Sequence, residues 1–363
     1  MGRLALFLAT ISSLTAQGTN AVAETKTAEP RSPGVGRIQS DTLIAWSLRG
    51  NLLGDAVERK FYLYLPPTYD TAPLSRYPVI YLLPGFGGGI DSWINGRLQG
   101  MNIKEEMDRL IAAHEVGEMI VVMPDSRNHY FGSHYVNSVV TGGWADAVVR
   151  DLVAHVDRKY RTIASLDSRG VAGWSMGGRG AFYLAMKYPG VFSSVYGLSS
   201  GWMAFDHSPP VSDEVWKRVL ELERTHPTGY EFKIPEEIDE ARAIGFATAF
   251  SPNAAHRPFM ADLPVQLVDG ELKLIPAVWQ RWLAYDPVVL LKRYASNLRH
   301  LRALQFDCGR SDQLLEANRI LARQLQAARV PHNFEEYDGT HVDHLRERIV
   351  KRMLPFFSSH LKR

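Results

Sequence analysis

The sequence is nearly devoid of cysteine: Cys308 is the only one among 363 residues. A lone cysteine forms no intrachain disulfide, and it excludes metal sites built from several thiolates. Asn-x-Ser/Thr sequences are also absent, so N-glycosylation is not expected. The fold must therefore depend on its hydrophobic core, in which we expect Cys308 to be a small, buried residue at the end of a strand.

An excess of charge of one sign is also lacking. The chain has 41 basic and 39 acidic side chains, a formal net charge of +2. This balance gives no reason to expect nucleic acid or an anionic membrane as a partner. After residue 23 no apolar run is long enough to span a bilayer, so stable membrane insertion is not expected.

The N-terminus has the pattern of a secretory signal. Arg3 precedes an apolar run, 4–14, and Ala21-Val22-Ala23 fits a small-x-small cleavage site. We predict a signal peptide at 1–23 and a flexible leader at 24–37, and hence a secreted or periplasmic protein. Cleavage after Ala16 and a retained anchor are the alternatives, although the run is short for an anchor.

The prediction of function depends mainly on the stretch 171–180. An apolar pair runs into Gly-x-Ser-x-Gly around Ser175, and a helical pattern follows at once. A strand, a sharp turn and a helix in this order leave the serine hydroxyl exposed at the turn. Gly173 and Gly177 leave room for the strand and the helix to approach each other. We interpret Ser175 as a nucleophile; an ordinary serine in a glycine-rich turn is the alternative.

Strand and helix patterns alternate along most of the chain. This alternation predicts an α/β fold: a mostly parallel central sheet with helices on both faces, preceded by an antiparallel pair at one edge. The expected strands are 42–48, 59–65, 79–83, 119–123, the strand before Ser175, 193–198, 301–307 and 333–337. The expected helices are 103–113, 144–160, the helix after Ser175, 313–328, and 342–361 with a kink at Pro355.

Residues 202–285 interrupt this rhythm. They contain several prolines and a charged helix near 212–225, but no clear strand–helix unit. The α/β pattern resumes afterwards, so we interpret 202–285 as a lid inserted into a single catalytic domain, 38–363. An independent second domain is the alternative.

A serine nucleophile needs a general base, and that base needs a residue that orients it. His341 follows the last strand within a loop, where a base would stand, whereas His344 lies a turn further on. We therefore favour His341. The two also form His-x-x-His, but no further ligands lie nearby, so a metal site is not expected.

The acid is expected in the loop after strand 301–307. Asp312 lies in that loop and can reach sideways to the histidine, whereas Asp307 ends the strand and could bind loop backbone instead. We favour Asp312 as the orienting acid. Its alternative role is to cap the helix that follows.

The negative oxygen formed during acyl transfer needs two hydrogen-bond donors. The backbone N–H of Met176 opens the helix after Ser175, where unpaired donors are available. The second is expected from the glycine-rich loop 84–88, and we choose the N–H of Phe86. A glycine-rich turn without function is the alternative.

Further loop residues at the same end of the sheet are candidates for substrate binding: Trp93, Asn128, Tyr135 and Trp202. Packing beneath the loops is the alternative for the aromatic ones. Arg179, after the nucleophile, is expected to face solvent or the lid.

Together these motifs resemble the putative-esterase family of α/β-hydrolases, which includes S-formylglutathione hydrolases, feruloyl and enterochelin esterases and mycolyl transferases. The matching pieces are 82–88, 122–125, 173–178, 307–312 and 339–341. The resemblance implies an α/β-hydrolase fold with Ser175, Asp312 and His341 as a triad and Phe86 and Met176 as oxyanion donors. Pro84 stands where many members have histidine or another residue before the glycine. The insertion at 202–285 is longer than in compact members, so the substrates of those members are not carried over to this chain.

These features predict a secreted serine carboxylic-ester hydrolase that works through an acyl-enzyme, without a cofactor, on a small-molecule or polysaccharide-linked ester. An acyltransferase with the same triad is the first alternative. A non-catalytic carbohydrate- or cell-wall-binding relative and a peptidase are the others.

Overall fold

The computed structural model describes residues 34–206 and 210–363. The expected signal peptide, 1–23, and most of the expected leader, 24–37, lie outside the described residues. Residues 34–363 belong to one compact unit. Within the described ranges, no helix combines the length and the apolar character needed to cross a membrane.

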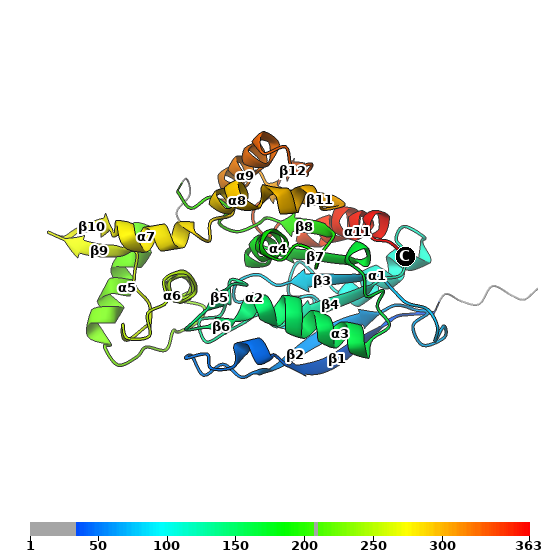
Figure 1. Ribbon diagram of the computed structural model, residues 1–363, viewed down its shortest axis with the longest axis horizontal. Helices are drawn as coiled ribbons and strands as arrows, with labels where there is room; N and C mark the ends of the chain where they lie inside the picture. The colour runs from blue at the N-terminus through cyan, green and yellow to red at the C-terminus, as the bar shows by residue number, and fades with distance from the viewer. Residues whose placement is uncertain (1–33, 207–209) are drawn as a thin grey trace, which may run out of the picture. The chain divides into compact units, whose positions relative to one another are not determined.

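A mixed sheet of eight strands runs through this unit (Figure 1). Its order is β1-β2-β4-β3-β7-β8-β11-β12. Only the pairs β1–β2 and β2–β4 are antiparallel, so the prediction of a mostly parallel sheet with an antiparallel edge is confirmed. The strands are β1 (Arg37–Ile44), β2 (Glu58–Leu65), β3 (Val79–Leu83), β4 (Ile120–Pro124), β7 (Arg169–Trp174), β8 (Ser194–Leu198), β11 (Ala303–Gly309) and β12 (Asn333–Tyr337).

The first strand lies earlier than predicted. The expected strand, 42–48, is β1 at Arg37–Ile44 followed by a 3-10 turn at Trp46–Leu48. Pairing with β2 places Arg37 opposite Leu65, so the ladder extends back through polar residues. Most of β1 is only partly buried, so the sequence has no apolar run there to reveal the strand.

Both faces of the sheet are buried. Val79, Tyr81 and Leu83 of β3 point into one core cluster, and Ile80 and Leu82 point into the other. This explains why β3 is a continuous apolar run. One face is covered by α3 (Val153–Lys159), α4 (Met176–Lys187), α8 (Pro287–Arg299) and α9 (Leu315–Ala327), and the other by α1 (Ile103–Ala112) and α11 (Leu354–His360).

Two predicted long helices contain wide turns. The segment 144–160 consists of α2 (Trp144–Asp146), a π-helical stretch at Ala147–Leu152, and α3. The segment 342–361 consists of α10 (Leu345–Arg348), a π-helical stretch at Ile349–Met353, and α11. Pro355 lies in the first turn of α11, where its missing N–H costs least.

The described residues of the segment 202–285 contribute no strand to the main sheet. It contains α5 (Asp213–Thr225), α6 (Ile238–Phe250), the hairpin β9 (Val265–Val268) and β10 (Glu271–Leu274), and α7 (Pro276–Leu283). These elements lie together at one end of the sheet, away from α1 and α11 (Figure 1). Helix α6 is buried around nearly its whole circumference, so the segment packs through a shared core.

Candidate active site

Ser175 occupies a strained turn between β7 and α4. Its backbone has φ 56° and ψ −118°, which is uncommon for a residue with a side chain. A Cβ at Gly177 would lie 2.2 Å from the Leu83 carbonyl oxygen, so only glycine allows helix and strand to meet here. The Ser175 N–H donates to Leu198 and its carbonyl accepts from Gly201, both at 2.9 Å. The turn at Ser175, which we call the elbow, is thus held by hydrogen bonds through both its N–H and its carbonyl group.

His341 and Asp312 form a direct pair. His341 Nδ1 lies 2.8 Å from Asp312 Oδ2, and the Asp312 carboxyl is shielded from solvent. The Trp174 ring packs against the imidazole at 5.1 Å between centroids, and its Nε1–H donates to the His341 carbonyl at 3.1 Å. The residue before Ser175 therefore helps to position the histidine.

Asp312 remains a carboxylate despite its burial. Burial alone would raise its pKa, but the hydrogen bond and charge of His341 and the amide of Leu314 hold the pKa below its usual value. The Leu314 N–H donates to Oδ1 at 2.9 Å, so Asp312 also caps the turn before α9. The buried thiol of Cys308, expected as a core residue, lies 3.5 Å from Oδ2.

The alternative acid and base are engaged elsewhere. Asp307 is buried and accepts from Tyr196 Oη at 2.7 Å and from Arg348 Nε at 3.0 Å, rather than from loop backbone as expected. His344 Nδ1 lies 3.1 Å from Glu347 Oε2.

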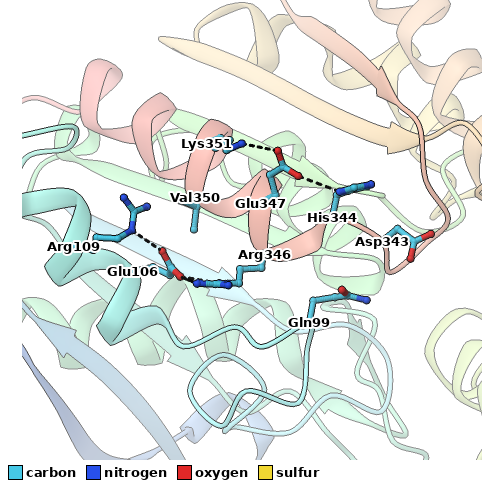
Figure 2. A pocket seen from close by; sticks show the side chains of 9 residues that line it. All are labelled: Gln99, Glu106, Arg109, Asp343, His344, Arg346, Glu347, Val350 and Lys351. Atoms are coloured by element: carbon cyan, nitrogen blue, oxygen red, sulfur yellow. Dashed lines mark hydrogen bonds and ion pairs between the residues drawn. The ribbon is translucent and has the colours of Figure 1, made fainter. Parts of the chain in front are cut away.

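Figure 2 shows His344 in a charged groove of about 460 Å³. Glu347 there also pairs with Lys351, and Glu106 pairs with Arg109 and Arg346. Both side chains of the His344–Glu347 pair are about half exposed, unlike the buried Asp312 carboxyl, and no serine, threonine or cysteine is among the described residues that line the groove.

Two backbone N–H groups near Ser175 are the expected oxyanion donors. Among the described residues, the N–H groups of Phe86 and Met176 donate no hydrogen bond. A Cβ at Gly85 would lie 3.4 Å from Ser175 Cβ, so the loop after β3 passes directly beside the nucleophile. The assignment of these two N–H groups as oxyanion donors stays a prediction.

The Ser175 hydroxyl makes no hydrogen bond to His341 or to any other described residue. Such bonds are often long in structures without substrate.

Several expected substrate-binding residues are buried. The side chains of Trp93 and Tyr135 have no exposed surface, so the expectation that they line a pocket is wrong in this structure. Trp93 packs in the core cluster beneath its loop, because its indole is too large to be left exposed there. Asn128 is also buried, and its Oδ1 accepts the N–H groups of Tyr130 and Gly132, so it shapes a loop.

Tyr135 braces the oxyanion loop from below. Its hydroxyl lies 2.8 Å from the Pro84 carbonyl oxygen and 2.8 Å from Ser126 Oγ. A Cβ at Gly180 would lie 2.3 Å from the Tyr135 ring, so the same side chain packs against α4. Sequence reasoning placed Tyr135 in a substrate pocket and missed this structural role, because contacts so distant in sequence leave no local pattern.

Arg179 is fully buried, so its expected exposure to solvent is wrong and its expected contact with the insertion is right. Its Nη2 donates to the Tyr285 carbonyl at 2.7 Å, and its guanidinium lies 4.8 Å from the Phe250 ring centroid. It forms no ion pair within the described ranges, and burial lowers its pKa to about 10.

His134 is a buried residue that the sequence reasoning did not identify. Its ring stacks on Phe246 of α6 at 4.1 Å and lies 5.9 Å from Phe86, between centroids. Burial and the charges of Arg179 and Arg242 hold its pKa well below the usual value, so the imidazole is neutral. The His134 ring therefore lies in aromatic contact with both the insertion and the loop that carries Phe86.

A cavity of about 520 Å³ lies near the loop of Asp312, although none of Ser175, His341 and Asp312 lines it. Trp202 lines it, next to Gly201, and so does Gln313, next to Asp312. Arg242 of α6 stands on a further wall, with its guanidinium 5.3 Å from the Trp202 ring centroid. Trp202 is thus an expected substrate-binding residue that lines this cavity.

The sheet, the elbow and the histidine–carboxylate pair define the α/β-hydrolase class, as predicted. A family model described as "Putative esterase" matches residues 56–345, and the chain belongs to this family.

Relatives and solved structures agree with this assignment. An esterase of Mycobacterium tuberculosis is 35% identical over 149 residues, 41% of this chain and 28% of the relative. An endo-1,4-beta-xylanase/feruloyl esterase of Xylanibacter ruminicola is 30% identical over 142 residues, 38% of this chain and 19% of the relative. The chain thus spans less than a third of the length of either relative.

The fold is shared with solved esterase structures. A ferulic acid esterase superposes with a TM-score of 0.61 at 22% identity, covering 90% of this chain and 100% of the other. An S-formylglutathione hydrolase from Agrobacterium tumefaciens gives 0.57 at 16% identity, covering 93% and 99%. At such identities the likeness concerns the fold.

Proposed function

We propose that this protein is a serine carboxylic-ester hydrolase that works through an acyl-enzyme. Ser175 is the nucleophile, His341 the general base and acid, and Asp312 the residue that orients His341. The N–H groups of Phe86 and Met176 bind the oxyanion. Family membership supports ester hydrolysis, and the 2.8 Å contact between His341 and Asp312 is the observation that carries the assignment of residues.

The reaction has two halves. Ser175 Oγ attacks the ester carbonyl carbon while His341 Nε2 takes the hydroxyl proton. The resulting oxyanion is bound by the two amides, which are worth about 3 kcal/mol each in related chemistry. His341 then protonates the departing alcohol, and the acyl-enzyme remains. Water attacks it with His341 as base, and the acid leaves.

Asp312 contributes by its charge and position. It fixes the tautomer in which His341 Nδ1 carries the proton, so that Nε2 is free to act as base, and it stabilises the imidazolium. Its depressed pKa keeps Asp312 ionised at neutral pH, so the acid of the pair is retained there.

Substrate and location form the finer part of the proposal. We place the substrate among small-molecule or polysaccharide-linked esters, and we assign 202–285 the role of a lid that shapes the site. Export to the periplasm or the exterior is supported by the apolar N-terminal pattern and by the single cysteine.

Hydrolysis of 4-nitrophenyl butyrate by the wild type and by Ser175→Ala tests the proposal. We expect turnover by the wild type and a loss of at least about 10⁴-fold in the variant. Turnover of 4-nitroanilides instead would indicate a peptidase, and an excess of transfer over hydrolysis with a sugar acceptor would indicate an acyltransferase. Equal activity in both proteins would contradict the role of Ser175.

A further inference from the structure

A second cavity, of about 430 Å³, lies within the segment 202–285. Three of the chain's eight tryptophans line it: Trp216 of α5, and Trp279 and Trp282 of α7. Phe205 lines it as well, and the β9–β10 hairpin contributes aliphatic side chains. We call this cavity the tryptophan chamber; the family model and the named relatives assign it no role.

The aromatic walls of the tryptophan chamber are fixed in place. Trp282 lies with its ring centroid 5.8 Å from that of Trp279 at an interplanar angle of 27°, and 5.9 Å from that of Trp216. The indole N–H of Trp282 donates to Ser251 Oγ at 2.8 Å. The indole N–H of Trp279 donates to Asp206 Oδ1 at 3.0 Å. Preorganised walls bind without the entropy cost of ordering side chains.

The charged groups that line the chamber are both carboxylates. Asp206 and Asp213 line it, and no lysine, arginine or histidine does so among the described lining residues. Such a chamber repels carboxylates and phosphates. Both aspartates are exposed and Asp206 already accepts from Trp279, so a ligand with hydroxyl donors can pair with their remaining oxygens, whereas a plain alkyl chain cannot.

The stacked indoles of Trp279 and Trp282 form a flat wall, and Trp216 stands at 63° to Trp282. A flat ring can lie against such a wall, and its hydroxyl groups can donate to the carboxylates.

The tryptophan chamber adjoins the cavity that Trp202 and Gln313 line. Pro210, Val211 and Asp213 line both cavities, so the two share a wall. Trp202 lines the cavity and Phe205, three residues on, lines the tryptophan chamber. The N–H of Gly201, the residue before Trp202, donates to the Ser175 carbonyl at 2.9 Å, so this wall lies close in sequence to the turn at Ser175.

We propose that the tryptophan chamber binds an uncharged ring that offers a flat face and hydroxyl donors, and that this ring belongs to the ester substrate. A pyranose and a phenol share this chemistry. The connection to the substrate rests on the proposed function, whereas binding of the ring does not.

Direct binding is measured from the indole N–H signals of the ¹⁵N-tryptophan-labelled protein, with Trp279 assigned by Trp279→Phe. Methyl β-glucopyranoside and 4-methylphenol are titrated separately. We expect at least one probe to shift the Trp279 signal at least fivefold more than the signal of Trp46, a surface residue outside the insertion. The responding probe identifies a sugar or a phenol. No selective shift, or a larger one with hexanol or tetramethylammonium, would overturn the proposal.

Kinetics test the connection to the ester. We compare methyl acetate, 6-O-acetyl methyl glucoside and 2-(4-hydroxyphenyl)ethyl acetate as substrates of the wild type, Trp279→Ala and the control Trp46→Ala. Trp279→Ala should lower kcat/KM at least tenfold, through KM, for a ring-bearing ester and less than twofold for methyl acetate. Equal losses on all three esters would overturn the role in substrate binding. If the wild type hydrolyses none of them, the proposed function fails, and the indole titration still decides whether the chamber binds a ring.

Discussion

The central sheet and the insertion at 202–285 are held together in different ways. Backbone ladders connect the eight strands of the sheet, and alternate side chains of each inner strand enter opposite cores. Among its described residues, the insertion has a ladder within the β9–β10 hairpin and an isolated bridge between Pro252 and Ala261. Its other elements pack through aromatic rings, with Phe246 in contact with His134, Trp202, Phe205, Phe250 and Trp282.

This difference separates two tasks. The sheet positions reactive groups, because Ser175, Asp312 and His341 each follow the carboxyl end of a parallel strand. The insertion supplies cavity walls, and α6 connects it to the loop of Phe86 through the stacked ring of His134. A change in the sheet's loops should therefore abolish chemistry, whereas a change in the insertion should alter stability and selectivity.

The largest effect is expected from Asp312→Asn. The amide would favour the wrong tautomer of His341 and would not stabilise its charge, so kcat/KM should fall by about 10³- to 10⁴-fold. Steady-state kinetics on 4-nitrophenyl butyrate measures this. Asp338→Asn is the matched control, since that side chain is 91% exposed and should leave activity unchanged. A fall in kcat/KM of less than tenfold in Asp312→Asn would contradict the claim that the loops of the sheet position the catalytic groups.

The next effect concerns the insertion. Phe246→Ala removes a fully buried ring from the centre of the aromatic cluster, and it should lower the free energy of unfolding by about 3 to 5 kcal/mol. Urea unfolding measures it. The control Leu274→Ala, on the half-exposed edge of β10, should cost about 0.5 kcal/mol or less. Equal effects in the two variants would mean that the aromatic cluster does not hold the insertion.

A smaller effect is expected at the contact below the oxyanion loop. Tyr135→Phe leaves the buried Pro84 carbonyl and Ser126 hydroxyl without this partner, which should cost about 1 to 2 kcal/mol of stability. We also expect kcat to fall more than KM changes, because the loop carries Phe86. Tyr62→Phe, at a half-buried position on β2, is the control. An unchanged kcat would limit Tyr135 to a structural role.

The smallest effect is a dependence of stability on pH at β12. Hydrogen bonds from Arg348 lower the pKa of Glu335 from 4.5 to about 2, against the effect of burial. A carboxyl whose pKa is depressed on folding stabilises the protein above its unfolded pKa, and this contribution is lost as the pH falls towards 2.

Glu335→Gln should therefore cost about 1 kcal/mol of unfolding free energy at pH 6, and this cost should decline between pH 4.5 and 2.5. Chemical denaturation of both proteins at the two extremes gives the difference. Glu316→Gln, at an exposed pair with Arg323, is the control. A cost that is the same at pH 6 and pH 2.5 would refute the depressed pKa.

The sequence reveals the parts of the sheet that are encoded locally. Strands such as Val79–Leu83 are continuous apolar runs, and the glycines around Ser175 are needed for a close approach that any other residue would prevent. The order of Ser175, Asp312 and His341 then restricts the acid and base to two loops. Geometry decided between Asp312 and Asp307, because only the structure shows that Arg348 engages Asp307.

The parts that depend on distant contacts could not be predicted. Strand β1 is set by its pairing with β2 rather than by its own composition. Arg179 is charged, yet it is buried because a carbonyl from the insertion and aromatic rings surround it. The tryptophan chamber combines residues from α5, α7 and β10, so no single stretch of sequence has the pattern of a ring-binding site.

The central claim is that Ser175 is an activated nucleophile. The most direct measurement is the intact mass of the purified protein after incubation with a fluorophosphonate, with Ser175→Ala treated in parallel. We predict one adduct on the wild type and none on the variant. A folded wild type that gains no mass, or a variant that gains the same adduct, would contradict the assignment of Ser175.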